Sequence, residues 1–318
     1  MNHADFADIY ARLRTAVSTV VIGQPELVDG ILVALLSSGH VLVEGAPGLG
    51  KTLVARAFAA CLGCDFKRVQ FTPDLMPSDI TGSSLYDRNR AAFEFMPGPV
   101  FTQLLLADEI NRAPAKTQSA LLEAMQDHQV SVDGTSRPLP APFVVVATQN
   151  SIESLGTYPL PEAQLDRFLL KLLVEDPSAE HERTIVRGHA QGFEPTDLSS
   201  LRPLVDPTQI VELQRVARSV RVEESVIGYI VDVVRRTRED KSLERGASPR
   251  ASISLMRAAQ VLAASAGRDF ITPDDVKPMA KAVLRHRVAL HPDAELQGVR
   301  VDDRLEDILR AVTVPRAG

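Results

Sequence analysis

Eight consecutive residues have the types and spacing of a loop that binds nucleotide phosphates. They are Gly45, Ala46, Pro47, Gly48, Leu49, Gly50, Lys51 and Thr52. Glycines let backbone N–H groups converge on phosphate oxygens, and a helix that begins at the end of the loop directs its positive end at the same anion. Lys51 can reach the β and γ phosphates, and the Thr52 hydroxyl can bind magnesium. The loop therefore predicts binding of ATP together with Mg²⁺.

Carboxylate and amide side chains follow two short apolar runs that are typical of buried strands. Leu104–Ala107 leads into Asp108 and Glu109, and Phe143–Ala147 leads towards Asn150. Beside a phosphate loop, Asp108 can hold the magnesium, and Glu109 can polarise the water that attacks the γ phosphate. The amide of Asn150 can hydrogen-bond to the γ phosphate and to that water. Each residue type is common at the end of a strand, so these residues indicate ATP hydrolysis only as a set with the loop.

The elements that must position these residues alternate between strands and helices as far as residue 176. Strands are expected at His40–Glu44, Lys67–Phe71, Leu104–Ala107, Phe143–Ala147 and Lys171–Val174, helices within residues 6–37 and at Thr52–Cys61 and Ala115–Gln126, and hairpins around Ser84–Phe95 and at Gln129–Thr135. Short apolar strands that alternate with helices predict an α/β fold in which both faces of a parallel sheet are covered. The turn of the second hairpin is expected at Asp133-Gly134.

Helical spacing replaces strands after Asp176-Pro177. Helices are expected at Ile210–Val220, Val226–Thr237, Ile253–Ala266 and Val276–Val288. Thr272-Pro273-Asp274-Asp275 has the cap, the proline and the acids of a helix start. A length of 318 residues fits two domains. We therefore expect an α/β nucleotide-binding domain over residues 1–176 and an all-helical domain over residues 177–318.

Composition and charge limit the classes of function. Hydrophobic residues make up 45% of the chain and charged residues 24%, which supports large buried cores. The formal net charge is −6, whereas proteins that bind the phosphate backbone of nucleic acids usually carry a basic surface. Aromatic residues make up 5% and Trp is absent, so stacking platforms for single-stranded nucleic acid are not favoured.

The chain shows no targeting or membrane-spanning pattern. Its apolar runs are much shorter than the ~20 residues of a membrane span, and the N-terminus lacks the basic and apolar regions of a signal peptide. Cys61 and Cys64 form a lone C-x-x-C pair, which is too few ligands for a tetrahedral zinc site. Packing on a helix explains this pair better than a redox role. We expect a cytoplasmic protein.

The order of these motifs resembles the AAA+ ATPases, because Leu165-Asp166-Arg167-Phe168 and a helical domain follow the Asn150 strand. Within them, four stretches resemble the MoxR family, namely Gln70–Leu75, Asp108–Ala113, Gln118–Met125 and Ala147–Asn150. The likeness covers nearly the whole chain. It implies a P-loop NTPase fold with a parallel five-stranded sheet sandwiched by helices, followed by a small all-helical lid domain.

The resemblance also assigns roles that spacing alone does not. Arg167 matches the arginine finger of the family, which reaches the ATP bound to the neighbouring subunit. Arg250 matches the sensor arginine of the lid domain, which couples the lid to the nucleotide. Ile22 and Gly23 match the segment that lies against the adenine, and Leu53 continues the nucleotide-binding loop.

A ring assembly is a further implication of the resemblance. We expect a homo-oligomer, a hexameric ring, that hydrolyses ATP to ADP and phosphate in order to remodel or mature a protein client. A protein with a von Willebrand factor A domain is the implied partner. The hairpins around Ser84–Phe95 and Gln129–Pro138 would project into the pore or onto one face of the ring. Arg112 is expected either to bridge subunits or to pair locally.

Three other functions share parts of this site. A nucleic-acid motor of the helicase-like AAA+ branch is disfavoured by the acidic composition and the scarce aromatic residues. The motor subunit of a metal chelatase or of a gas-vesicle system would differ in its partner rather than in its site. A small-molecule kinase is disfavoured by the helical lid and by Arg167.

Overall fold

A five-stranded parallel sheet forms the centre of the N-terminal half. The computed structural model describes residues 1–150, 157–194 and 197–315. The strands are β1 (Val41–Gly45), β2 (Phe66–Gln70), β5 (Leu104–Asp108), β8 (Val144–Gln149) and β9 (Leu170–Val174). Their order is β2-β5-β8-β1-β9, and every neighbouring pair is parallel. The chain leaves β1 towards β2 on one side and later reaches β9 on the other, so ligands are expected where the carboxyl ends of β1, β5 and β8 meet.

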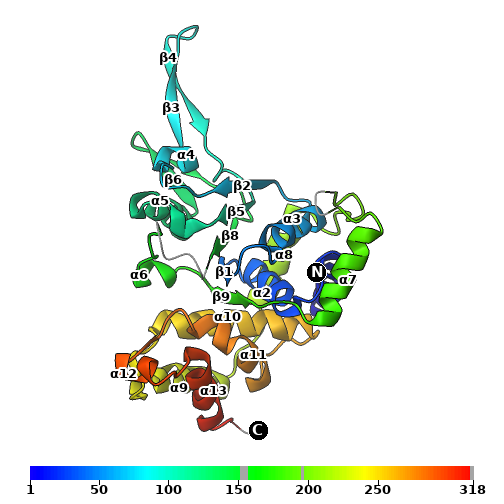
Figure 1. Cartoon of the computed structure of the whole chain (residues 1–318), viewed down its shortest axis with the longest axis vertical. Coiled ribbons are helices and arrows are strands. Elements are labelled where there is room, and N and C mark those ends of the chain that lie inside the picture. The colour runs from blue at the N-terminus through cyan, green and yellow to red at the C-terminus, as the bar shows by residue number, and fades with distance from the viewer. Residues whose placement is uncertain (151–156, 195–196, 316–318) are drawn as a thin grey trace.

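Helices cover both faces of this sheet, as the uninterrupted apolar strands predict. Successive side chains of a strand point to opposite faces. Val41 and Val43 accordingly belong to one core with α1 (His3–Ser18), α2 (Pro25–Leu36) and α3 (Lys51–Leu62), whereas Leu42 belongs to a second core with α5 (Ala115–Asp127). Figure 1 shows α2 and α3 on one side of the strands and α5 on the other. The predicted α/β fold is therefore confirmed.

Both expected hairpins are present. β3 (Gly82–Asp87) pairs with β4 (Ala92–Pro97), and this hairpin extends away from the sheet at the top of Figure 1. β6 (Gln129–Val132) pairs with β7 (Thr135–Pro138). Asp133 and Gly134 have φ of +52° and +73°, and two positive φ angles are what a two-residue hairpin turn of this kind requires.

The C-terminal half is mainly helical. Its longer helices are α7 (Ala179–Ala190), α8 (Pro207–Arg218), α9 (Glu224–Glu239), α10 (Pro249–Ser265), α11 (Pro273–Leu284) and α13 (Val301–Ala311). Four of these were predicted, whereas α7, α13 and the short helices α4 (Pro77–Thr81), α6 (Glu162–Leu165) and α12 (Pro292–Leu296) were not. One core cluster contains residues from both sides of position 176, and the division of the chain there stays a prediction.

The expectation that strands stop at residue 176 was wrong in one detail. β10 (Leu243–Arg245) pairs antiparallel with β11 (Ala289–Leu290) among the lid helices. These strands are three and two residues long, which is too short for an alternating pattern to show in the sequence. None of the helices in the described part of the chain is long and apolar enough to cross a membrane.

His40 joins α5 to strand β8 and should make folding sensitive to acid. The backbone N–H of Val145 donates to its Nδ1 at 3.0 Å, so its Nε2 carries the proton and donates to the Met125 carbonyl at 3.0 Å. Burial lowers the pKa of His40 from 6.5 to about 4. Between these values the unfolded chain binds a proton that the folded chain does not, so stability falls as the pH falls.

We expect His40 to remove about 2 kcal/mol from the free energy of unfolding between pH 7.5 and pH 5. Urea unfolding at the two pH values measures this loss. His40→Gln is the matched control, because an amide can make both hydrogen bonds without titrating in this range. An equal loss of stability in both proteins would contradict the assignment to His40.

Candidate functional site

The phosphate loop lies between β1 and α3, where the topology predicts a ligand. Gly48 and Gly50 have φ of +88° and +76°, a region that favours glycine, and no atom lies within 4 Å of the position that a side chain would occupy at either residue. α3 begins at Lys51, so its unpaired N–H groups face the loop. Lys51 Nζ donates to the Gly45 carbonyl at 2.6 Å and to Asn150 Oδ1 at 2.9 Å. The lysine therefore links the loop to the end of β8.

Asp108 ends β5 directly beside this loop. The Thr148 hydroxyl donates to its Oδ1 at 2.6 Å, and the Thr52 hydroxyl lies 3.5 Å from its Oδ2. Arg68, from the neighbouring strand β2, donates to the same Oδ2 from Nε at 3.0 Å and from Nη2 at 2.7 Å. The Arg68 guanidinium therefore occupies the carboxylate oxygen that faces Thr52.

These oxygens fit a magnesium ion that binds together with a nucleotide. Thr52 and Asp108 provide hard oxygen ligands, which Mg²⁺ prefers, and Mg²⁺ commonly takes only one or two ligands from the protein and the rest from phosphates and water. The described residues contain no group of three or more His, Cys, Asp or Glu side chains that could hold a metal by themselves. The site is therefore suited to a metal that arrives with phosphate.

Three side chains hold the carboxylate of Glu109. Asn150 Nδ2 donates to its Oε1 at 3.0 Å, Gln70 Nε2 donates to its Oε2 at 2.8 Å, and Arg112 Nη1 lies 3.2 Å from Oε2. The backbone of Glu109 has φ of +56°, which is uncommon for a residue with a side chain, and its N–H donates to the Thr148 hydroxyl at 2.9 Å. The local pairing expected as one alternative for Arg112 is present.

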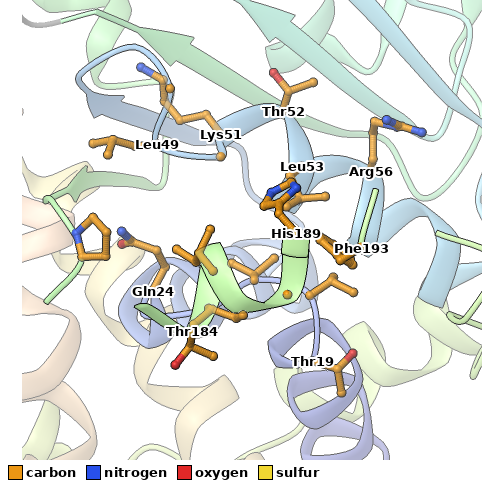
Figure 2. Close-up of a pocket in the computed structure, with 18 of the residues that line it drawn as sticks. Thr19, Gln24, Leu49, Lys51, Thr52, Leu53, Arg56, Thr184, His189 and Phe193 are labelled. Carbon is orange, nitrogen blue, oxygen red and sulfur yellow. The ribbon is translucent and has the colours of Figure 1, made fainter. Parts of the chain in front are cut away.

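A pocket of about 710 Å³ opens from the phosphate loop. The predicted site residues that line it are Ile22, Gly48, Leu49, Gly50, Lys51, Thr52, Leu53 and Asp108. The opposite wall comes from α7 and the residues that follow it, namely Thr184, Ile185, Arg187, Gly188, His189, Gln191 and Phe193. Figure 2 shows Leu49, Lys51 and Thr52 on one side of the cavity and Gln24 and Thr184 on the other. Gly23 faces α7 instead, since a side chain there would meet the His181 ring at 2.9 Å.

The two predicted arginines lie outside the wall of this pocket. Arg167 follows α6 and is half-buried, and Arg250 is exposed in the first turn of α10. Asp166 is bound by Arg287 at 2.6 Å and by the Ser248 hydroxyl at 3.3 Å. In the part of the chain that the structure describes, Arg167 forms no ion pair. A role for Arg167 in a neighbouring site is compatible with this position.

The surroundings of the C-x-x-C pair favour packing over a redox role. Burial raises the pKa of both Cys61 and Cys64 to about 11. Both residues are free cysteines at the end of α3. Their thiols are therefore protonated at neutral pH, which disfavours redox chemistry.

Several residues of the site escaped prediction. Gln70 and Thr148 lie in stretches that resemble the MoxR family but were given no role, Arg68 lies in no motif, and α7 was not expected at all. Strand register explains the role of Gln70, because it lies opposite Asp108 in the β2–β5 pair. The predicted set of Lys51, Thr52, Asp108, Glu109 and Asn150 is brought together by contacts that span between 40 and 100 residues of sequence.

Comparison with known proteins agrees with this architecture. The model of the ATPase family associated with various cellular activities (AAA) matches residues 40–170, and the AAA lid domain matches residues 235–308. The chain is 45% identical to the chaperone MoxR1 of Mycobacterium tuberculosis, covering 94% of this chain and 81% of that protein. It is 46% identical to the uncharacterised protein YeaC of Bacillus subtilis, covering 94% and 92%.

A third relative and a solved structure extend the comparison. Protein MoxR of Methylorubrum extorquens is 31% identical, with 98% of this chain and 96% of that protein covered. The crystal structure of a presumed ATPase from Cytophaga hutchinsonii superposes with a TM-score of 0.90 at 38% identity, covering 99% of this chain and 97% of that one. Fold, site and relatives agree, and the chain belongs to the MoxR family of AAA+ ATPases.

Proposed function

We propose that this protein hydrolyses ATP to ADP and phosphate in a magnesium-dependent reaction. The observation that carries the proposal is the continuous chain of hydrogen bonds from Lys51 through Asn150 to Glu109. It connects the residue type that grips the phosphates to the carboxylate that can accept a proton, through an amide that can contact both the γ phosphate and the water. The AAA family to which the chain belongs supports the same reaction.

Each residue has a defined part in this reaction. The loop N–H groups and Lys51 hold the β and γ phosphates. Asn150 orients a water in line with the γ phosphorus, and Glu109 accepts a proton as the water oxygen bonds to phosphorus and the bond to the bridging oxygen of ADP breaks. Magnesium, held by Thr52 and Asp108, would neutralise phosphate charge. Arg68 binds Asp108 Oδ2 in this structure and would compete with that ion for the carboxylate.

The site is completed by a neighbouring subunit in this proposal. Arg167 would donate to the γ phosphate bound in the next copy of the chain, within a homo-oligomeric, hexameric ring. Arg250 would act at the same junction, because Ser248, two residues before it, contacts Asp166, which precedes Arg167. Ile22 and the α7 wall would enclose the adenine.

The cellular task that we propose is remodelling of a protein client, as in a chaperone. The relative named chaperone MoxR1 supports this class of task. A protein with a von Willebrand factor A domain remains the proposed partner, and the hairpin β3–β4 is proposed to face the pore or rim of the ring. Two free cysteines suit the reducing cytoplasm.

Phosphate release and particle size test the proposal together. The protein with ATP and Mg²⁺ should release phosphate at a rate on the order of 1–10 per second, and EDTA should abolish release. ATP with Mg²⁺ should raise the mass measured by light scattering to that of a ring. A monomer under all conditions would contradict the ring, and stimulation by DNA or RNA that weakens with salt would point to a nucleic-acid motor.

A further inference from the structure

A buried arginine of the lid grips the backbone around Arg167. Arg287 follows α11 and is only 5% exposed. Its Nη2 donates to the Phe168 carbonyl at 2.6 Å and to the Asp166 carbonyl at 3.3 Å, and its Nη1 donates to the Leu169 carbonyl at 3.0 Å. Its Nε donates to Asp166 Oδ1 at 2.6 Å. The guanidinium therefore binds the residue before Arg167 and the two residues after it.

Other lid residues strengthen the same attachment. His286 Nε2 contacts the Phe168 carbonyl at 3.1 Å, and Arg285 Nη1 donates to the Lys171 carbonyl at 3.3 Å. The Ser248 hydroxyl, at the start of α10, donates to Asp166 Oδ2 at 3.3 Å. Lid residues thus contact the segment from Asp166 to Lys171 on both sides of Arg167.

Arg287 also forms hydrogen bonds to two helices of the lid. Arg287 Nη2 also donates to Ser254 Oγ in α10 at 3.3 Å, and Nη1 donates to the Val283 carbonyl in α11. A guanidinium is a rigid planar group, so donors used on opposite sides hold their partners in one geometry. A charged group this deeply buried persists only when it is paired and hydrogen-bonded, so breaking this contact is costly.

We infer that Arg287 is a positioning residue, which fixes Arg167 to the lid so that the two move as one body. The inference rests on the proposed function, in which Arg167 completes the site of the neighbouring subunit. The expected effect passes from one subunit to its neighbour. The orientation of the lid in one subunit sets the position of the finger and thereby the hydrolysis rate in the next subunit, while the subunit that carries Arg287 keeps its own nucleotide site intact.

Arg287→Lys tests this, because lysine keeps the charge and loses the planar fork. We expect hydrolysis to fall by about 10- to 100-fold, since small misplacements of a group that acts on the transition state have effects of this size. The affinity for a fluorescent ATP analogue should stay within about 2-fold of wild type. Arg304→Lys is the matched control, because this lid arginine pairs with Asp240 away from the finger segment, and its rate should match wild type.

Mixed assemblies give the decisive readout. Lys51→Ala subunits lack a working loop but supply an intact Arg167, so mixing them with Arg287→Lys should restore hydrolysis. Mixing Arg287→Lys with Arg167→Ala should restore none, because neither chain supplies a working finger. If Arg287 only supported the nucleotide site of its own subunit, the pattern would invert, with rescue by Arg167→Ala and none by Lys51→Ala.

Two further measurements keep the outcomes distinct. Asp166→Asn removes the charged partner of Arg287 without emptying the buried position, and it should show the same rescue pattern with a smaller loss of rate, even if Arg287→Lys does not fold. Arg167→Ala alone is the reference. Wild-type hydrolysis by Arg167→Ala would overturn the proposed role of the finger. If Arg167→Ala is inactive but Arg287→Lys hydrolyses ATP at the wild-type rate or shows the inverted rescue pattern, only the positioning role is overturned.

Discussion

Replacing Arg167 with alanine should lower ATP hydrolysis by about 10³-fold or more without weakening ATP binding, because a cation supplied to the transferring phosphoryl group is worth about 10³–10⁵ in rate. The guanidinium acts on charge that develops in the transition state, so its loss affects turnover and not the ground-state complex. Arg167 lies outside the pocket of its own subunit, which separates it from binding. Phosphate release and the dissociation constant of a fluorescent ATP analogue measure the two effects.

Mixing variants identifies the subunit in which Arg167 acts. Arg167→Ala supplies an intact phosphate loop, and Lys51→Ala supplies an intact finger, so a mixed interface can unite the two and regain activity. Arg12→Ala is a suitable control, because this exposed arginine pairs with Asp8 on the same helix and should leave the rate unchanged. Failure of every mixing ratio to restore hydrolysis would rule out action between subunits.

The strands and the phosphate loop could be predicted because their signals are local. An apolar run such as Leu104–Ala107 is long enough to show its type, and glycine spacing before Lys51 is specific. α7 could not be predicted in this way. None of its residues is buried, and apolar residues are few in its sequence, although it forms a wall of the pocket. The strands β10 and β11 are too short to carry any pattern.

The site was predictable where acids follow an apolar strand in a chain that also carries a phosphate loop, as for Asp108 and Glu109. It was not predictable where an ordinary side chain reaches the site from a distant part of the sequence. Arg68 reaches Asp108 from 40 residues away along the chain, and Arg287 reaches Asp166 from 121 residues away. Only the fold brings such residues together. The resemblance to the family identified Arg250 as a site residue. The hydrogen bond between Asp166 and Ser248, at the start of the same helix, could be seen only in the structure.

Replacing Glu109 with glutamine should leave ATP bound but nearly unhydrolysed, with a fall of about 10²–10⁴-fold in turnover, the usual contribution of a positioned general base. Glutamine has the same shape, and its carbonyl can still accept from Asn150 Nδ2. Its amide, however, cannot take a proton from water. It also points N–H donors at the donors of Gln70 and Arg112, so the side chain is held less firmly. Single-turnover phosphate release measures the loss.

The outcome also separates hydrolysis from assembly. Because Glu109→Gln keeps the loop, Lys51 and Arg167, it should form the ATP-dependent ring and remain in it, whereas wild type should leave the assembled state as ATP is consumed. Glu123→Gln, on the exposed side of α5, is the matched control and should hydrolyse ATP normally. Turnover by Glu109→Gln within about 3-fold of wild type would exclude a general base, and the hydrogen bonds from Asn150 and Gln70 would then only stabilise the end of β5.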